Sequence, residues 1–292
     1  MCFTKNGNPG GRRWITACVA LLTLGLAAVG TSCSSGPQPS QPGTPAFYWA
    51  AANETYRGGD FVRTSENLQR ILVGENEFTK RARAWDAVIS SGLAQGYIEL
   101  ADAWEAGARA TRPNPTPFRK QVSALRSLAS ASAIQFTEDV HRVVEADKDP
   151  NIVLTFAFPA GGAAPPAGLK RVAGGILVQD SERDMLQAAM LQRGVLLSVC
   201  AAVGSRDDAA AAQEKLKTGE FRAPRDAFLL VAAKSLSNQS ELFTGSKLDL
   251  PNRLKMLSEE ALKALEAVPQ SKETKSLTDK IQARLKKARI SI

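Results

Sequence analysis

The sequence predicts an all-α protein built from packed helical hairpins and interrupted by one irregular insertion rich in glycine and proline. From residue 46 onward, long runs rich in alanine and leucine place apolar residues at spacings of three and four. Glycine, proline and asparagine separate these runs, as they do at the ends of helices. Because one helix cannot bury its apolar stripe alone, the helices must pack against one another, as a right-handed solenoid of hairpins or as a bundle.

Residues 1–32 have the pattern of a secretory signal peptide. Three basic residues, Lys5, Arg12 and Arg13, precede the apolar run WITACVALLTLGLAAVG at 14–30. This run is short for a helix that spans a membrane. We therefore expect an exported protein.

Cys33 follows the apolar run where a signal peptidase would cut. The segment around it resembles the lipobox of bacterial lipoproteins, which implies that Cys33 is lipidated and anchors the chain in the cell envelope, on the periplasmic side of the outer membrane. Acylation at Cys18 and simple secretion are the alternatives. Residues 33–45, rich in Ser, Pro, Gln and Gly, are expected to form a flexible tether.

Residues 46–150 contain a pattern that recurs when the chain is shifted by 37 positions. Gly59 then lies over Gly96, and Asn76 lies over Pro113. Each unit reads as a helix, a turn containing glycine, a second helix and a closing Pro or Asn. A third copy, at 119–152, keeps the length and the ending Pro150-Asn151 but lacks the central glycine.

These units resemble the tetratricopeptide repeat, a helix-turn-helix unit of about 34 residues. The first unit carries the aromatic and small residues of that family and its turn, namely Tyr48, Ala52, Tyr56 and Gly59-Asp60-Phe61. The second offers Trp85, the segment QGYIELA at 95–101 as its turn, and Pro113 as its terminator. An unrelated helical bundle is the alternative.

In the tetratricopeptide family, the first helix of each pair lines a concave surface that binds a protein or peptide. By this resemblance, six residues are nominated to contact a partner: Trp49, Asn53, Arg57, Arg83, Asp86 and Ser90.

Residues 151–176 break the helical pattern. Ile152, Leu154, Phe156 and Phe158 alternate as in a strand, and a loop rich in Gly and Pro follows. The insertion either covers apolar surface between helices or serves as a binding loop or lid.

Residues 177–292 return to helical repeats. One hairpin turns at Gly204, and the segment 251–269 reads as a further helix closed by Pro269. The last segment, 275–292, is basic and amphipathic, and its apolar stripe is expected to pack on the preceding helices as a cap. Contact with anionic lipid or with a partner is the alternative.

The sequence contains no recognisable catalytic signature. Its single histidine, His141, lies near Glu138 and Glu145 on a helix, and it has neither the companions of a metal site nor those of a catalytic triad. After removal of the signal peptide and lipidation of Cys33, Cys200 is the remaining cysteine and is expected to be buried in the core. We therefore expect neither an enzyme nor a cofactor or metal site.

Charge argues against nucleic acid as a partner. The formal net charge is +8, but the signal peptide and residues 272–292 carry all of this excess, so that residues 34–271 are neutral. The predicted function is therefore binding of a protein or peptide partner. The alternative is a helical lipoprotein component of a solute uptake system, with a small apolar ligand.

Overall fold

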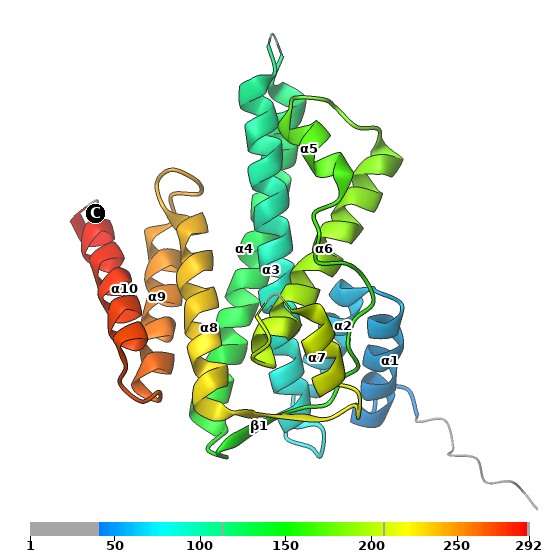
Figure 1. Ribbon diagram of the computed structural model, residues 1–292, viewed down its shortest axis with the longest axis vertical. Coiled ribbons are helices and arrows are strands. Elements are labelled where there is room, and N and C mark those ends of the chain that lie inside the picture. Colours follow the sequence, from blue (N-terminus) through cyan, green and yellow to red (C-terminus); the bar gives the residue numbers. More distant parts are fainter. Residues whose placement is uncertain (1–40, 113, 207, 291–292) are drawn as a thin grey trace, which may run out of the picture. The chain divides into compact units, whose positions relative to one another are not determined.

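The computed structural model describes residues 41–112, 114–206 and 208–290, with the side chains of 289 and 290 left out. Figure 1 shows helices connected by loops, with one short two-stranded sheet. The described helices and strands are α1 (Pro45–Arg57), α2 (Phe61–Ile71), α3 (Thr79–Ala110), α4 (Thr116–Ala146), β1 (Asn151–Leu154), α5 (Ala167–Ala173), α6 (Asp180–Ala202), α7 (Ala209–Lys215), β2 (Phe221–Pro224), α8 (Arg225–Gln239), the 3₁₀ helix η1 (Ser240–Phe243), α9 (Pro251–Glu266) and α10 (Lys272–Ile290).

The first predicted hairpin is confirmed as α1 and α2. Gly59 supplies the turn with a φ of +77°, a conformation that glycine adopts without steric cost. The side chain of Asp60 then begins α2 by accepting a hydrogen bond from the backbone N–H of Arg63 at 3.2 Å. Asn76 closes the unit, since its side-chain oxygen accepts from the N–H of Phe78 at 2.9 Å just before α3.

The second predicted hairpin is wrong. Gly96, expected in a turn, lies inside α3, which runs unbroken for 32 residues. Gly92 and Gly96 instead lie where α3 crosses α6. A Cβ on Gly92 would stand 2.5 Å from the Cα of Val195, and one on Gly96 would stand 2.8 Å from the carbonyl oxygen of Met190. The glycines are explained by this close crossing and not by a turn.

The third predicted copy is also a single helix, α4, which packs along α3 as its antiparallel neighbour (Figure 1). The helices are too long for tetratricopeptide units, and the arrangement in residues 79–146 is one long hairpin. Around it, α1 and α2 lie at the N-terminal half of α3, α6 crosses α3, and α8 and α9 pack on α4.

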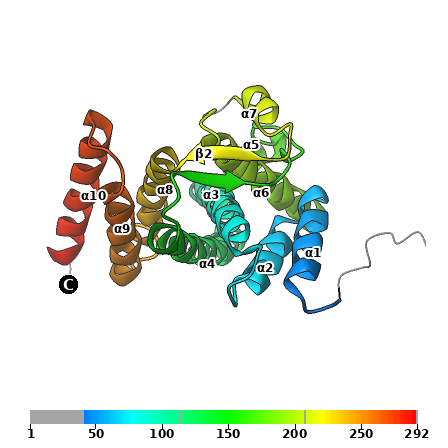
Figure 2. The same ribbon diagram turned by 90° about the horizontal axis from the view of Figure 1, so that it is seen from below.

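The insertion at 151–176 contributes a strand, so that the expectation of an all-α chain is corrected. β1 pairs antiparallel with β2, with Ile152 opposite Ala223 and Leu154 opposite Phe221 (Figure 2). The predicted alternation is confirmed, because Ile152, Leu154 and Phe156 are buried. Phe156 stacks on Trp85 with ring centroids 5.6 Å apart, so this part of the insertion covers the core between α1 and α3.

The C-terminal half follows the predicted order of helices more closely. Gly204 turns the chain after α6 with a φ of +68°, and Cys200 is buried as expected. α10 packs on α9, as expected for the capping helix, and its apolar side chains Ile281 and Leu285 are buried. The last two residues of the segment 275–292 lie outside the described residues.

One described helix, α6, is long and apolar enough to cross a membrane by length and composition, but half of its apolar window is buried inside the fold. It is a core helix, because it packs along α3.

Candidate functional site: an arginine-lined groove

The six nominated partner-binding residues do not form one surface. Trp49 is half-buried and stacks on Phe78, with ring centroids 5.3 Å apart. Asn53 donates its side-chain N–H back to the carbonyl oxygen of Trp49 at 2.8 Å, whereas Arg57 is exposed at the end of α1. Partner binding by these three side chains stays a prediction.

The other three nominated residues are interior. Arg83, Asp86 and Ser90 are 5%, 0% and 1% exposed, so their side chains do not reach a partner at the surface of this fold. The guanidinium of Arg83 bridges Glu75 at 3.1 Å and Asp147 at 3.9 Å, which ties α3 to the segments before and after the long hairpin.

Asp86 and Ser90 belong to a buried polar cluster between α2, α3 and α4. Its centre is a pair of carboxyl groups, Asp86 on α3 and Asp139 on α4, both fully buried. Ser65 donates to Asp86 at 2.6 Å, Ser90 donates to Asp139 at 3.1 Å, and Gln69 donates to both. Further donors to Asp139 are Gln135 at 3.0 Å and the guanidinium of Arg142 at 3.2 Å.

Burial raises the pKa of both carboxyl groups. For Asp86 the pKa rises to about 6, although hydrogen bonds from Ser65 and Gln69 oppose the rise. For Asp139 the pKa lies well above its usual value, first through burial and then through the charge of Asp86. The hydrogen bond between the two acids lowers the pKa of Asp86 and raises that of Asp139, as expected when Asp139 keeps its proton and donates to Asp86.

Asp86 and Asp139 are both 0% exposed, so we assign the cluster to the core. The open depressions on the described residues lie elsewhere.

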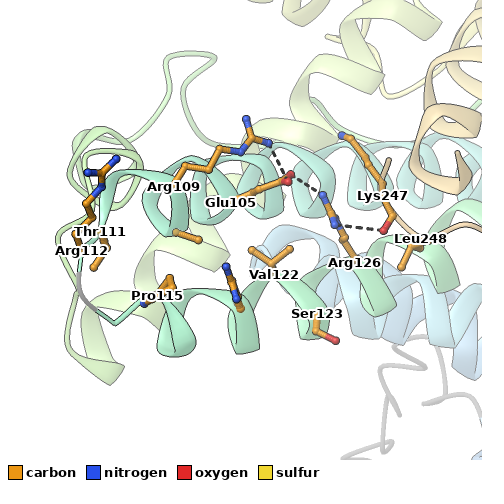
Figure 3. A pocket seen from close by; sticks show the side chains of 12 residues that line it. Glu105, Arg109, Thr111, Arg112, Pro115, Val122, Ser123, Arg126, Lys247 and Leu248 are labelled. Atoms are coloured by element: carbon orange, nitrogen blue, oxygen red, sulfur yellow. Dashed lines mark hydrogen bonds and ion pairs between the residues drawn. The ribbon is translucent and has the colours of Figure 1, made fainter. Parts of the chain in front are cut away.

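A groove of about 780 Å³ lies at the opposite end of the long hairpin, where α3 ends and α4 begins. Two helix faces and two loops form it. α3 contributes positions 105, 108 and 109, and α4 contributes positions 119, 122, 123 and 126. The loop from α3 to α4 contributes Thr111, Arg112 and Pro115, and the loop before α9 contributes Lys247 and Leu248. Figure 3 shows Glu105 and Arg109 of α3 facing Val122 and Arg126 of α4, with Arg112 towards one end and Lys247 towards the other.

The inner end of the groove holds an internal ion-pair network. Glu105 accepts from Arg126 at 2.5 Å and pairs with Arg109 at 2.9 Å, while Lys247 pairs with Asp102 at 2.7 Å. Burial works against ionisation of Glu105, but the hydrogen bond from Arg109 and the charges of Arg126, Arg109 and Lys247 outweigh it and lower its pKa. Glu105 is therefore ionised at neutral pH.

The outer end carries uncompensated positive charge. Arg112 and Arg119 are exposed, line the groove and form no ion pair with any residue in the described ranges. The lining as a whole has five cationic side chains and one carboxylate. A carboxylate or another anion is the ligand group that such a lining attracts.

Sequence reasoning missed this groove because net charge averages over the chain. Residues 34–271 are neutral in total, yet four of their arginines converge at one place. The signal that would have found it is charged residues at helical spacing, at 105 and 109 on α3 and at 119 and 126 on α4, whereas Arg112 lies in the loop after α3.

His141 lies outside both the buried cluster and the groove. Its Nδ1 is 3.1 Å from a carboxylate oxygen of Glu260 on α9, whereas its helical neighbours Glu138 and Glu145 pair with Arg142 and Lys263. Among the described residues, no three His, Cys, Asp or Glu side chains are grouped as metal ligands would be.

No protein family model, no curated protein and no solved structure matches this chain.

Proposed function

We propose that this protein is a non-catalytic, lipid-anchored binding protein of the bacterial cell envelope that holds an acidic segment of a protein partner in the arginine-lined groove. The observation that carries the proposal is the pair Arg112 and Arg119, exposed at the outer end of the groove without a carboxylate partner in the described chain. Guanidinium groups bind carboxylates with two parallel hydrogen bonds, and desolvation in a groove strengthens such pairs.

The position of the groove suits an anchored chain. The tether predicted at 33–45 joins the fold at α1, which packs against the N-terminal half of α3 through Trp49 and Tyr56 around Trp85. The groove lies at the C-terminal end of α3, and a helix of 32 residues is about 48 Å long. A partner can therefore occupy the groove far from the point at which the tether is attached. Lipidation of Cys33, outside the described residues, remains part of the proposal.

The lining also favours an acidic ligand over the alternative of a small apolar one. Six of the twelve lining residues are charged and five of these are cationic, while the apolar side chains include Ala108, Val122 and Leu248. An apolar solute would leave the guanidinium groups without partners, at a cost in desolvation.

Photo-crosslinking in native membranes tests the proposal. Ser123 is exposed and lines the groove, so a p-benzoylphenylalanine introduced there is expected to give a discrete adduct with a partner protein. The double reversal R112E/R119E should abolish the adduct, because it replaces two attractive charges by two repulsive ones.

The matched control is K275E/K286E, which changes the net charge equally through exposed lysines of α10 outside the groove. It should leave the adduct intact. An adduct that survives R112E/R119E, or an equal loss in both double variants, would contradict the proposed function.

A further inference from the structure

The groove presents its side chains in a fixed order along its length. Residues 119, 122, 123 and 126 of α4 share one face, so the levels of Arg119, Val122 and Arg126 follow one another along the helix axis. With a rise of 1.5 Å per residue, Val122 lies about 4.5 Å and Arg126 about 10.5 Å beyond Arg119. The antiparallel α3 adds Ala108 to the lining, and the loop after α3 adds Arg112.

These levels differ in what they offer a ligand. At the outer end, Arg119 of α4 and Arg112 of the loop after α3 lack a carboxylate partner in the described chain. At the inner end, Glu105 already pairs with Arg126 and Arg109. Val122 lies between Arg119 and Arg126 on α4 and is 8% exposed, and Ala108 and Leu248, both partly buried, add apolar surface to the lining.

The groove therefore combines one site for an anion with one neighbouring site for an apolar side chain. In an extended chain, side chains two residues apart point to the same side and are about 6.6 Å apart. This separation is of the same order as the step of about 4.5 Å along α4 from Arg119 to Val122. If the acid and the apolar residue were adjacent in the peptide sequence, their side chains would point to opposite faces of the extended chain.

Building on the proposed function, we propose that the groove recognises an extended peptide segment of the form acid–x–apolar, in which the acid binds Arg112 and Arg119 and the apolar side chain packs on Val122 and Leu248. The attraction between the acid of the peptide and the two guanidinium groups supplies most of the affinity, and the apolar contact selects among acidic segments.

Calorimetric titration of three short peptides with blocked ends tests this motif. The peptides contain Glu-Gly-Leu, Gln-Gly-Leu or Glu-Gly-Ser between flanking glycines, and blocked ends remove terminal charges. The protein is the full chain. We expect Glu-Gly-Leu to bind at least about fivefold more tightly than either of the other two peptides.

Two variants test which side chains of the groove produce each preference among the peptides. Arg119→Gln should remove the preference for Glu over Gln, and Leu248→Ser, in a loop at the rim, should remove the preference for Leu over Ser. The control Lys286→Gln should change neither preference. Circular dichroism shows whether each variant is folded before its titration is interpreted.

Equal affinity for Glu-Gly-Leu and Glu-Gly-Ser would overturn the motif, although the proposed function would stand if the adduct at Ser123 still depended on Arg112 and Arg119. Binding of all three peptides too weak to measure, with tight and arginine-dependent binding to vesicles that contain phosphatidylglycerol, would overturn a peptide ligand in favour of an anionic lipid surface.

Discussion

At the scale of single residues, the buried pair Asp86 and Asp139 couples the stability of the fold to pH. Two carboxyl groups with one nearby cation, Arg142, cannot both ionise in the core without strong repulsion. Their pKa values are raised in the folded chain, so the folded chain holds a proton that the unfolded chain releases above a pH of about 4. The contribution of this pair to the stability of the fold is therefore greatest at low pH, and it is lost as the pH rises through the pKa values that the two groups have in the folded chain.

The variant Asp139→Asn tests this coupling. An amide keeps the ability to donate to Asp86 but does not titrate, so the free energy of unfolding should lose much of its dependence on pH between 5 and 8. The wild-type chain should lose about 2 kcal/mol more than the variant over this range. Urea denaturation at a series of pH values measures both curves. A variant whose curve runs parallel to that of the wild type would show that the pair does not share a proton.

Single residues also explain which parts of the site could be foreseen. The tetratricopeptide resemblance nominates Asp86 and Ser90 because they fall in the first helix of a unit, which lines the concave surface in that family. It does not nominate Asp139, whose position opposite Asp86 depends on how α4 packs on α3. Sequence spacing shows which residues share one helix face, but it does not show which other helix covers that face.

At the scale of elements, glycines decide how closely α3 and α6 approach. A Cβ on Gly194 would stand 2.2 Å from the carbonyl oxygen of Gly92, and a Cβ on Gly92 would meet the backbone of Val195 at 2.5 Å. Backbone atoms at such distances cannot move aside as a flexible side chain does. The crossing thus requires glycine at both positions.

Gly92→Ala should consequently destabilise the fold, although alanine is the better helix former. The gain in helix propensity is about 1 kcal/mol, whereas overpacking a close contact costs about 1 to 3 kcal/mol, with the upper end expected where only backbone atoms could move aside. A net loss of about 2 kcal/mol is expected in urea denaturation. Gly168→Ala is the control, because the Cβ there would find only side-chain atoms, the nearest at 3.6 Å. Equal stability of both variants would contradict the tight crossing.

Elements that depend on residues close together in the chain could be predicted from the sequence, whereas contacts between distant segments could not. The hairpin of α1 and α2 depends on Gly59 and Asp60, whose effects act within a few residues. The strand character of Ile152 and Leu154 was visible in the alternation, but the pairing strand β2 lies about 70 residues further along the chain and leaves no trace beside them. Gly96 has the same local neighbourhood as a turn glycine, and only the approach of α6 distinguishes its role.

At the scale of the whole molecule, most of the described elements pack on the long hairpin of α3 and α4, while α10 packs on α8 and α9. The end at which α3 begins and α4 ends carries the aromatic cluster around Trp85 and, through Asp86 and Asp139, the buried acid pair. The far end of the hairpin carries the groove. The helical class and the order of most helices followed from periodicity, whereas the groove arises from two helix ends that the repeat pattern had assigned to separate units.

Two places on this molecule are candidates for binding a partner. One is the arginine-lined groove, and the other is the surface of α1 that the tetratricopeptide resemblance nominates. Hydrogen exchange of the full chain, measured by mass spectrometry with and without a saturating Glu-Gly-Leu peptide, distinguishes these two places most directly. We predict slower exchange in the last turns of α3, the first turns of α4 and the loop at 244–250, with α1 and α2 unchanged. Protection confined to α1 and α2, around Trp49, Asn53 and Arg57, would contradict the assignment of binding to the arginine-lined groove.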